Sequence, residues 1–86
     1  MDRIEQIRKL LNDSPNDAFL NYALATEYVA MGSDELALPI FVNLVNTQPN
    51  YYATYYHLGK LYERIEDEDM AIQTYEKGLE ITKQLD

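Results

Sequence analysis

Residues 15–37 read PNDAFLNYALATEYVAMGSDELA, and residues 49–71 read PNYYATYYHLGKLYERIEDEDMA. The second stretch follows the pattern of the first at an offset of 34 residues. The identical pairs are Pro15/Pro49, Asn16/Asn50, Tyr22/Tyr56, Leu24/Leu58, Tyr28/Tyr62 and Ala37/Ala71. A fixed period of this length is typical of stacked repeat proteins, in which each unit buries its apolar face against the next.

The spacing of apolar residues and the positions of turn-forming residues predict five helices along the chain. They are expected over residues 2–13, 17–31, 34–47, 51–65 and 68–84. Gly32 is suited to a left-handed conformation that ends the second helix, and Ser33 to capping the third. Pro39 lacks the amide that would bond to the carbonyl of Glu35, so the third helix is expected to bend or to have an irregular first turn.

The composition limits the classes of protein to which the chain can belong. Its 86 residues suffice for one domain, and its hydrophobic content of 47% is ordinary for a globular fold. The absence of cysteine excludes disulfides and thiolate metal sites. The net charge of −8 disfavours nucleic acid and anionic membranes as partners. No apolar run approaches the roughly 20 residues that span a bilayer, and the N-terminus is unlike a secretory signal, so a cytoplasmic location is expected.

The repeated positions resemble the tetratricopeptide repeat (TPR). The matching residues are Leu24, Ala25, Tyr28, Gly32, Ala37, Phe41 and Pro49 in the first copy, and Tyr55, Leu58, Gly59, Tyr62, Ala71, Tyr75 and Gly78 in the second. The resemblance implies an all-α fold, a right-handed stack of antiparallel helix hairpins. It divides one domain, residues 1–86, into a leading half-repeat helix (2–15), repeat 1 (18–51) and repeat 2 (52–85). The chain departs from the family pattern at Asn21, Leu44 and Glu66, which stand where a large residue, a small residue and a turn glycine are usual.

The resemblance also implies a concave groove, lined by the first helix of each repeat, that binds a peptide or a segment of a partner protein. Carried onto this sequence, the groove residues are Phe19, Tyr22, Thr26, Tyr56, His57, Lys60 and Arg64. His57, Lys60 and Arg64 are spaced to share one helical face, which would suit a carboxylate or an acidic peptide. Other interpretations remain open, because the tyrosines could pack against neighbouring helices and Arg64 could pair with nearby acids.

Three functions compete. The first is a non-catalytic adaptor that needs no cofactor and binds a partner in the groove. The second is a structural assembly module that dimerises through its terminal helices. Some of Ile72, Tyr75, Leu79 and Ile81 need cover that no capping helix in this sequence supplies, so we expect this end either to pair with another subunit or to belong to a longer chain. Catalysis is disfavoured, because one histidine, no cysteine and no glycine-rich phosphate loop leave few catalytic or metal-binding constellations.

Overall fold

The computed structural model describes residues 2–85, which form five helices and no strand. They are α1 (Arg3–Asp13), α2 (Ala18–Ala30), α3 (Asp34–Thr47), α4 (Ala53–Arg64) and α5 (Glu68–Leu85). Every predicted helix is present, and each end differs from its prediction by two residues or fewer. Agreement is close because proline, glycine and asparagine mark three of the four breaks between periodic apolar segments, and an acidic run from Glu66 to Asp69 marks the fourth.

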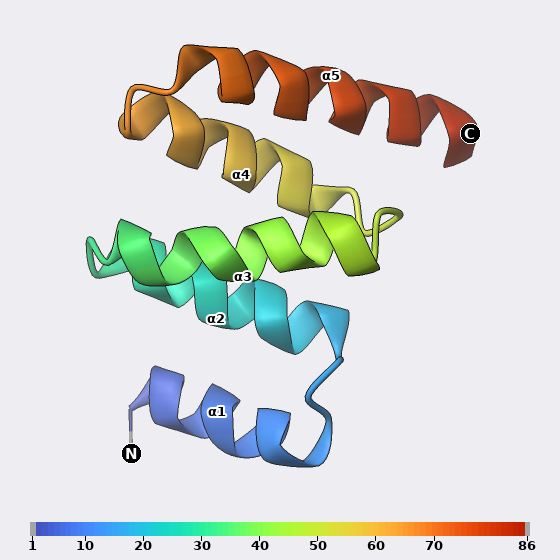
Figure 1. The fold of residues 1–86 in the computed structure, drawn as a ribbon. Coiled ribbons are helices and arrows are strands. Elements are labelled where there is room, and N and C mark those ends of the chain that lie inside the picture. Colours follow the sequence, from blue (N-terminus) through green and yellow to red (C-terminus); the bar gives the residue numbers. More distant parts are fainter. Residues whose placement is uncertain (1, 86) are drawn as a thin grey trace.

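The helices stack in chain order, and each packs against its neighbours in the sequence (Figure 1). α1, α3 and α5 run in one direction, and α2 and α4 run in the other, so α1 and α5 lie at opposite ends of the stack. The predicted all-α stack of antiparallel hairpins is confirmed. This arrangement makes α2 and α4, the first helices of the two repeats, the elements on which the predicted groove residues lie.

Small residues allow the paired helices to approach closely. A Cβ at Gly59 would lie 2.3 Å from the ring of Tyr75, and a Cβ at Gly78 would lie 2.7 Å from the Cβ of Tyr55. The core around these contacts holds Leu24, Ala25, Tyr28, Ala37, Phe41, Leu44, Leu58, Leu61, Tyr62 and Ala71. Aromatic side chains therefore fill the space beside positions that carry little or no side chain.

The turn between α2 and α3 was predicted only in part. Gly32 adopts a φ of 79°, the expected left-handed conformation. Ser33 precedes α3, but its side chain makes no capping hydrogen bond, so that prediction was wrong. Its ψ of 62° lies outside the extended region that aims an N-cap side chain at the following amides. Asp17, with a ψ of 120°, does cap α2 and accepts a hydrogen bond from the amide of Leu20 at 2.9 Å.

Pro39 is accommodated within α3, which continues from Asp34 to Thr47. In its first turn the amides of Leu36 and Ala37 both donate to the carbonyl of Ser33, at 3.1 and 3.2 Å. The turn therefore mixes 3₁₀ and α hydrogen bonding.

Two departures from the family pattern have local structural explanations. The side-chain amide of Asn21 donates to the carbonyls of Pro15 and Asp17, at 3.0 and 2.9 Å, and so ties α2 to the loop before it. Glu66 adopts the left-handed conformation, with a φ of 65°, in the turn between α4 and α5. Glutamate pays a steric cost there that glycine would avoid, which explains the usual glycine at this position.

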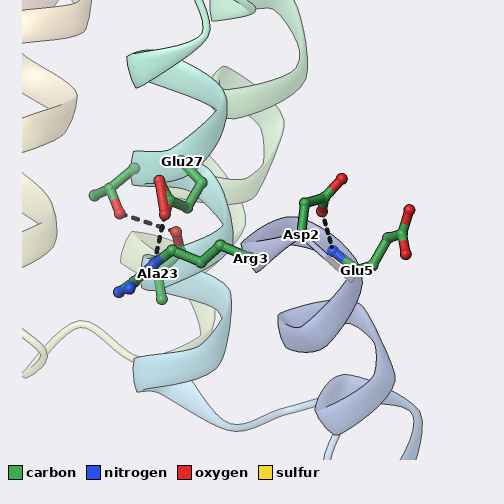
Figure 2. A network of polar contacts seen from close by, with 6 residues as sticks. Asp2, Arg3, Glu5, Ala23 and Glu27 are labelled. Atoms are coloured by element: carbon green, nitrogen blue, oxygen red, sulfur yellow. Dashed lines mark hydrogen bonds and ion pairs between the residues drawn. The ribbon is translucent and has the colours of Figure 1, made fainter.

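Polar contacts cap α1 and join it to α2. Asp2 caps it by accepting from the amide of Glu5 at 2.9 Å, and Arg3 reaches across to Glu27 on α2, with Nε 2.5 Å from Oε1 (Figure 2). The guanidinium of Arg8 donates to the hydroxyl of Tyr28 and lies 5.8 Å from its ring centroid. These contacts supplement the burial of the apolar face of α1 against α2.

Candidate functional site

Side chains from α2 and α4 meet in an aromatic cluster. We define the aromatic cluster as Tyr22, Phe41, Tyr51, Tyr56 and His57. The ring centroid of Tyr22 lies 5.2 Å from that of His57 and 5.6 Å from that of Tyr51. His57 in turn lies 5.3 Å from Tyr56 and stacks on Phe41, at 6.3 Å and 13°. Tyr22 and Tyr56, one from each repeat, are therefore on the same side of the molecule.

Two aromatic residues of α2 and α4 are largely exposed. Phe19 on α2 is 60% exposed, and Tyr56 on α4 is 59% exposed. Thr26 is half-buried, and its hydroxyl donates to the carbonyl of Ala23 at 2.9 Å. Phe19 and Tyr56 are the residues of this surface with the most area to offer a partner.

The predicted basic stripe is largely neutralised by the chain itself. Arg64 binds both carboxylate oxygens of Asp34, with Nε 3.0 Å from Oδ2. These hydrogen bonds lower the pKa of Asp34 and raise that of Arg64. Lys60 Nζ lies 3.8 Å from Glu63 Oε2, in an exposed pair that is worth little and leaves the ammonium accessible. Between Lys60 and Arg64, Lys60 therefore has the weaker ion pair within the chain and is the more available to bind an acidic group of a partner.

The third member, His57, sits among rings instead of facing solvent as a cation. Burial lowers its pKa below 6.5, because desolvation disfavours the charged imidazolium. Burial likewise raises the pKa of Tyr22, with Tyr51 adding to the shift. At neutral pH the cluster is therefore an uncharged aromatic surface.

We expect the protein to lose stability as the pH falls from about 7.5 to about 5. Because the pKa of His57 is lower in the folded state, the unfolded chain takes up its proton first, so this contribution to stability is full above about pH 7.5 and declines as the pH falls through about 6.5. His57 is the single histidine of the chain, so a His57→Gln variant should lose most of this dependence. Thermal melts of both proteins across this range test the prediction, and a slope shared by the two would contradict it.

Two members of the cluster were missed from the sequence. Tyr51 lies in the turn before α4, and Phe41 is a buried residue of α3. Phe41 was recognised as a repeat position without a link to the groove. The run Tyr51, Tyr52, Tyr55 and Tyr56 was the available signal for Tyr51, since four tyrosines around one helix start exceed what a single buried face requires.

Two hollows lie outside the aromatic cluster. One of 380 Å³ lies between α3, α4 and α5, and one of 570 Å³ lies beside α1 and α2. Within residues 2–85, no group of three or more histidine, aspartate and glutamate side chains could hold a metal ion. None of the helices in this range combines the length and apolarity needed to cross a bilayer.

Comparisons with known proteins agree on one family. A tetratricopeptide repeat model matches residues 52–85. The crystal structure of a tetratricopeptide repeat domain protein from Salinibacter ruber is 48% identical, with a TM-score of 0.78 over 80% of this chain and 77% of that one. The solution structure of a tetratricopeptide repeat domain protein from the same organism is also 48% identical, with a TM-score of 0.78 over 81% of this chain and 71% of that one.

A more distant structure shares the fold. MamA from AMB-1 is 22% identical, with a TM-score of 0.78 over 91% of this chain and 43% of its own length. A search of curated proteins found no match. The repeat pattern, the helical stack and the identity to the Salinibacter ruber structures agree, and this chain belongs to the tetratricopeptide repeat family.

Proposed function

We propose that this chain is a non-catalytic interaction module that binds a peptide or a segment of a partner protein on the α2/α4 surface. The observation that carries the proposal is the aromatic cluster, in which Tyr22 and His57 join the first helices of the two repeats at 5.2 Å. Tyrosine and phenylalanine are effective anchors because they are rigid and bury a large apolar area. The family to which the chain belongs is one of protein-interaction scaffolds.

The partner segment that fits this surface best carries apolar or aromatic side chains. Phe19 and Tyr56 supply exposed rings, while His57 is half-buried among rings and Arg64 is bound to Asp34. An acidic or carboxylate group of the partner would therefore bind Lys60, whose contact with Glu63 is weak. A nucleic acid or an anionic membrane would be opposed by the net charge of −8.

Binders selected from a random peptide library test this proposal. We expect Phe19→Ala and Tyr56→Ala each to weaken the selected peptides by about tenfold, since central aromatic anchors contribute most of the affinity. Ile72→Ala on α5 removes a similarly exposed apolar side chain elsewhere and serves as the matched control. Peptides that are sensitive to Ile72 and indifferent to Phe19 and Tyr56 would contradict the proposal.

Self-association is a second candidate, favoured by the exposed apolar side chains of α5. Ile72 and Leu79 project from this helix at one end of the stack. Of the other two residues expected to need cover, Ile81 is buried and Tyr75 is half-buried. The candidate therefore concerns the exposed face of α5 that carries Ile72 and Leu79.

A further inference from the structure

α5 carries two parallel apolar stripes, of which one is covered. Ala71, Thr74, Gly78 and Ile81 form the buried stripe, with spacings of three and four residues. The same spacing recurs one position later in Ile72, Tyr75, Leu79 and Thr82, which we call the second stripe. Successive residues of an α-helix are rotated by about 100°, so the second stripe lies about a quarter turn around α5 from the covered stripe.

Two residues of the second stripe are largely exposed to solvent. Ile72 is 57% exposed and Leu79 is 65% exposed. Beside them lies a hollow of 330 Å³ lined by Tyr52, Tyr55, Tyr56, Tyr75, Gly78, Leu79 and Thr82. An apolar stripe at spacings of three and four residues is the surface that a second helix covers.

Charged residues beside the stripe favour one kind of helix. Glu76 and Lys83 are exposed and seven residues apart, so they lie along the same edge of the second stripe. A copy of α5 laid antiparallel, with the two helices crossing near Leu79, brings Glu76 of each copy beside Lys83 of the other. A parallel copy would instead leave the two charged edges on opposite sides of the interface, where Glu76 and Lys83 could not pair. The edge is thus self-complementary in the antiparallel orientation.

We propose that the second stripe binds a second copy of this chain, α5 against α5 and antiparallel, to form a symmetric dimer. This inference specifies the self-association candidate above by its helix, its orientation and its two ion pairs. The same patch meets itself across a twofold axis, as closed dimers require. Each copy carries a net charge of −8, which opposes association, but charges more than about 8 Å apart are largely screened at physiological ionic strength.

Sedimentation velocity of the whole chain over a concentration series tests the interface. Leu79→Glu places a charge at the centre of the stripe, and we expect it to abolish the dimer. Leu10→Glu is the matched control, because Leu10 is an exposed leucine on α1, at the other end of the stack. That variant is expected to dimerise as the wild type does.

Charge exchange tests the orientation. Glu76→Lys and Lys83→Glu each replace both ion pairs by like charges, and we expect each to weaken the dimer by about fivefold or more. The double variant should restore wild-type affinity. Lys77→Glu is the control, because Lys77 lies on the face of α5 opposite the second stripe and pairs with Glu80 at 4.0 Å; it should leave the dimer unchanged.

Two results would overturn the proposal. One is a wild type that remains monomeric throughout the series, which would assign the second stripe to a different protein. The other is a dimer that Leu79→Glu leaves intact or that the double charge exchange fails to restore. Leu79→Glu should still bind the selected peptides, and the groove variant Phe19→Ala should still dimerise, so failure of one proposal can be told from failure of the other. Tyr56→Ala is not used for this purpose, because Tyr56 also lines the hollow beside the second stripe.

Discussion

Replacing Phe41 with alanine is expected to lower the free energy of unfolding by about 3–5 kcal/mol. Phe41 is fully buried at the middle of α3, where its ring contacts Tyr22 of α2 and His57 of α4. Its removal leaves a cavity between the two repeats as well as lost apolar burial. A chain of 86 residues has a total stability on the order of 4–13 kcal/mol. Much of the Phe41→Ala protein should therefore be unfolded near 37 °C.

Urea denaturation followed by circular dichroism measures this loss. Phe19→Ala is the matched control, because it removes the same side chain from an exposed site and should change stability by no more than about 0.5 kcal/mol. Phe41→Leu should fall between the two, since leucine fills most of the space. Equal effects of the two alanine substitutions would show that Phe41 does not join the repeats.

Gly78→Ala is expected to destabilise the protein by about 1–3 kcal/mol, although alanine is the better helix former by about 1 kcal/mol. The added Cβ would lie 2.7 Å from the Cβ of Tyr55, which cannot rotate away because it is attached directly to the backbone. Tyr55 is held further by the hydrogen bond from its hydroxyl to the carbonyl of Pro49, at 2.7 Å. α4 and α5 would therefore have to separate.

Gly59→Ala provides the comparison for Gly78→Ala. The Cβ it adds would meet the ring of Tyr75, which is half-buried and can turn about its side-chain bonds. We expect a smaller loss than at Gly78, measured as melting temperature under the same conditions. An increase in stability for Gly78→Ala would mean that helix propensity outweighs close packing and that α4 and α5 are less tightly joined than their geometry indicates.

The architecture was predictable because its determinants are local or periodic. Proline and glycine mark three of the four breaks, and small residues at Ala25, Ala37, Gly59 and Gly78 mark the close contacts. The cap of α3 was not predictable in this way, because Ser33 has the right side chain but a ψ of 62° that misdirects it. Residue type alone does not determine the backbone conformation on which a cap depends.

The site was less predictable than the fold because side-chain pairing across helices decides its charge. The pairing of Arg64 with Asp34 links residues 30 positions apart, and the rings around His57 come from three segments. Helical spacing correctly placed Lys60 and Arg64 on α4, yet it could not show that Arg64 is bound by an acid of α3. Tyr51 joined the cluster from a turn, where periodicity carries no information.

The most direct measurement of partner binding is an assigned NMR spectrum of the chain, titrated with a peptide selected from the library. We expect the largest shift changes at Phe19, Tyr22, Tyr56 and His57, with a smaller one at Lys60, because these residues form the surface shared by α2 and α4. Changes confined to α1, α3 and α5, with the aromatic cluster unaffected, would contradict the proposed binding surface.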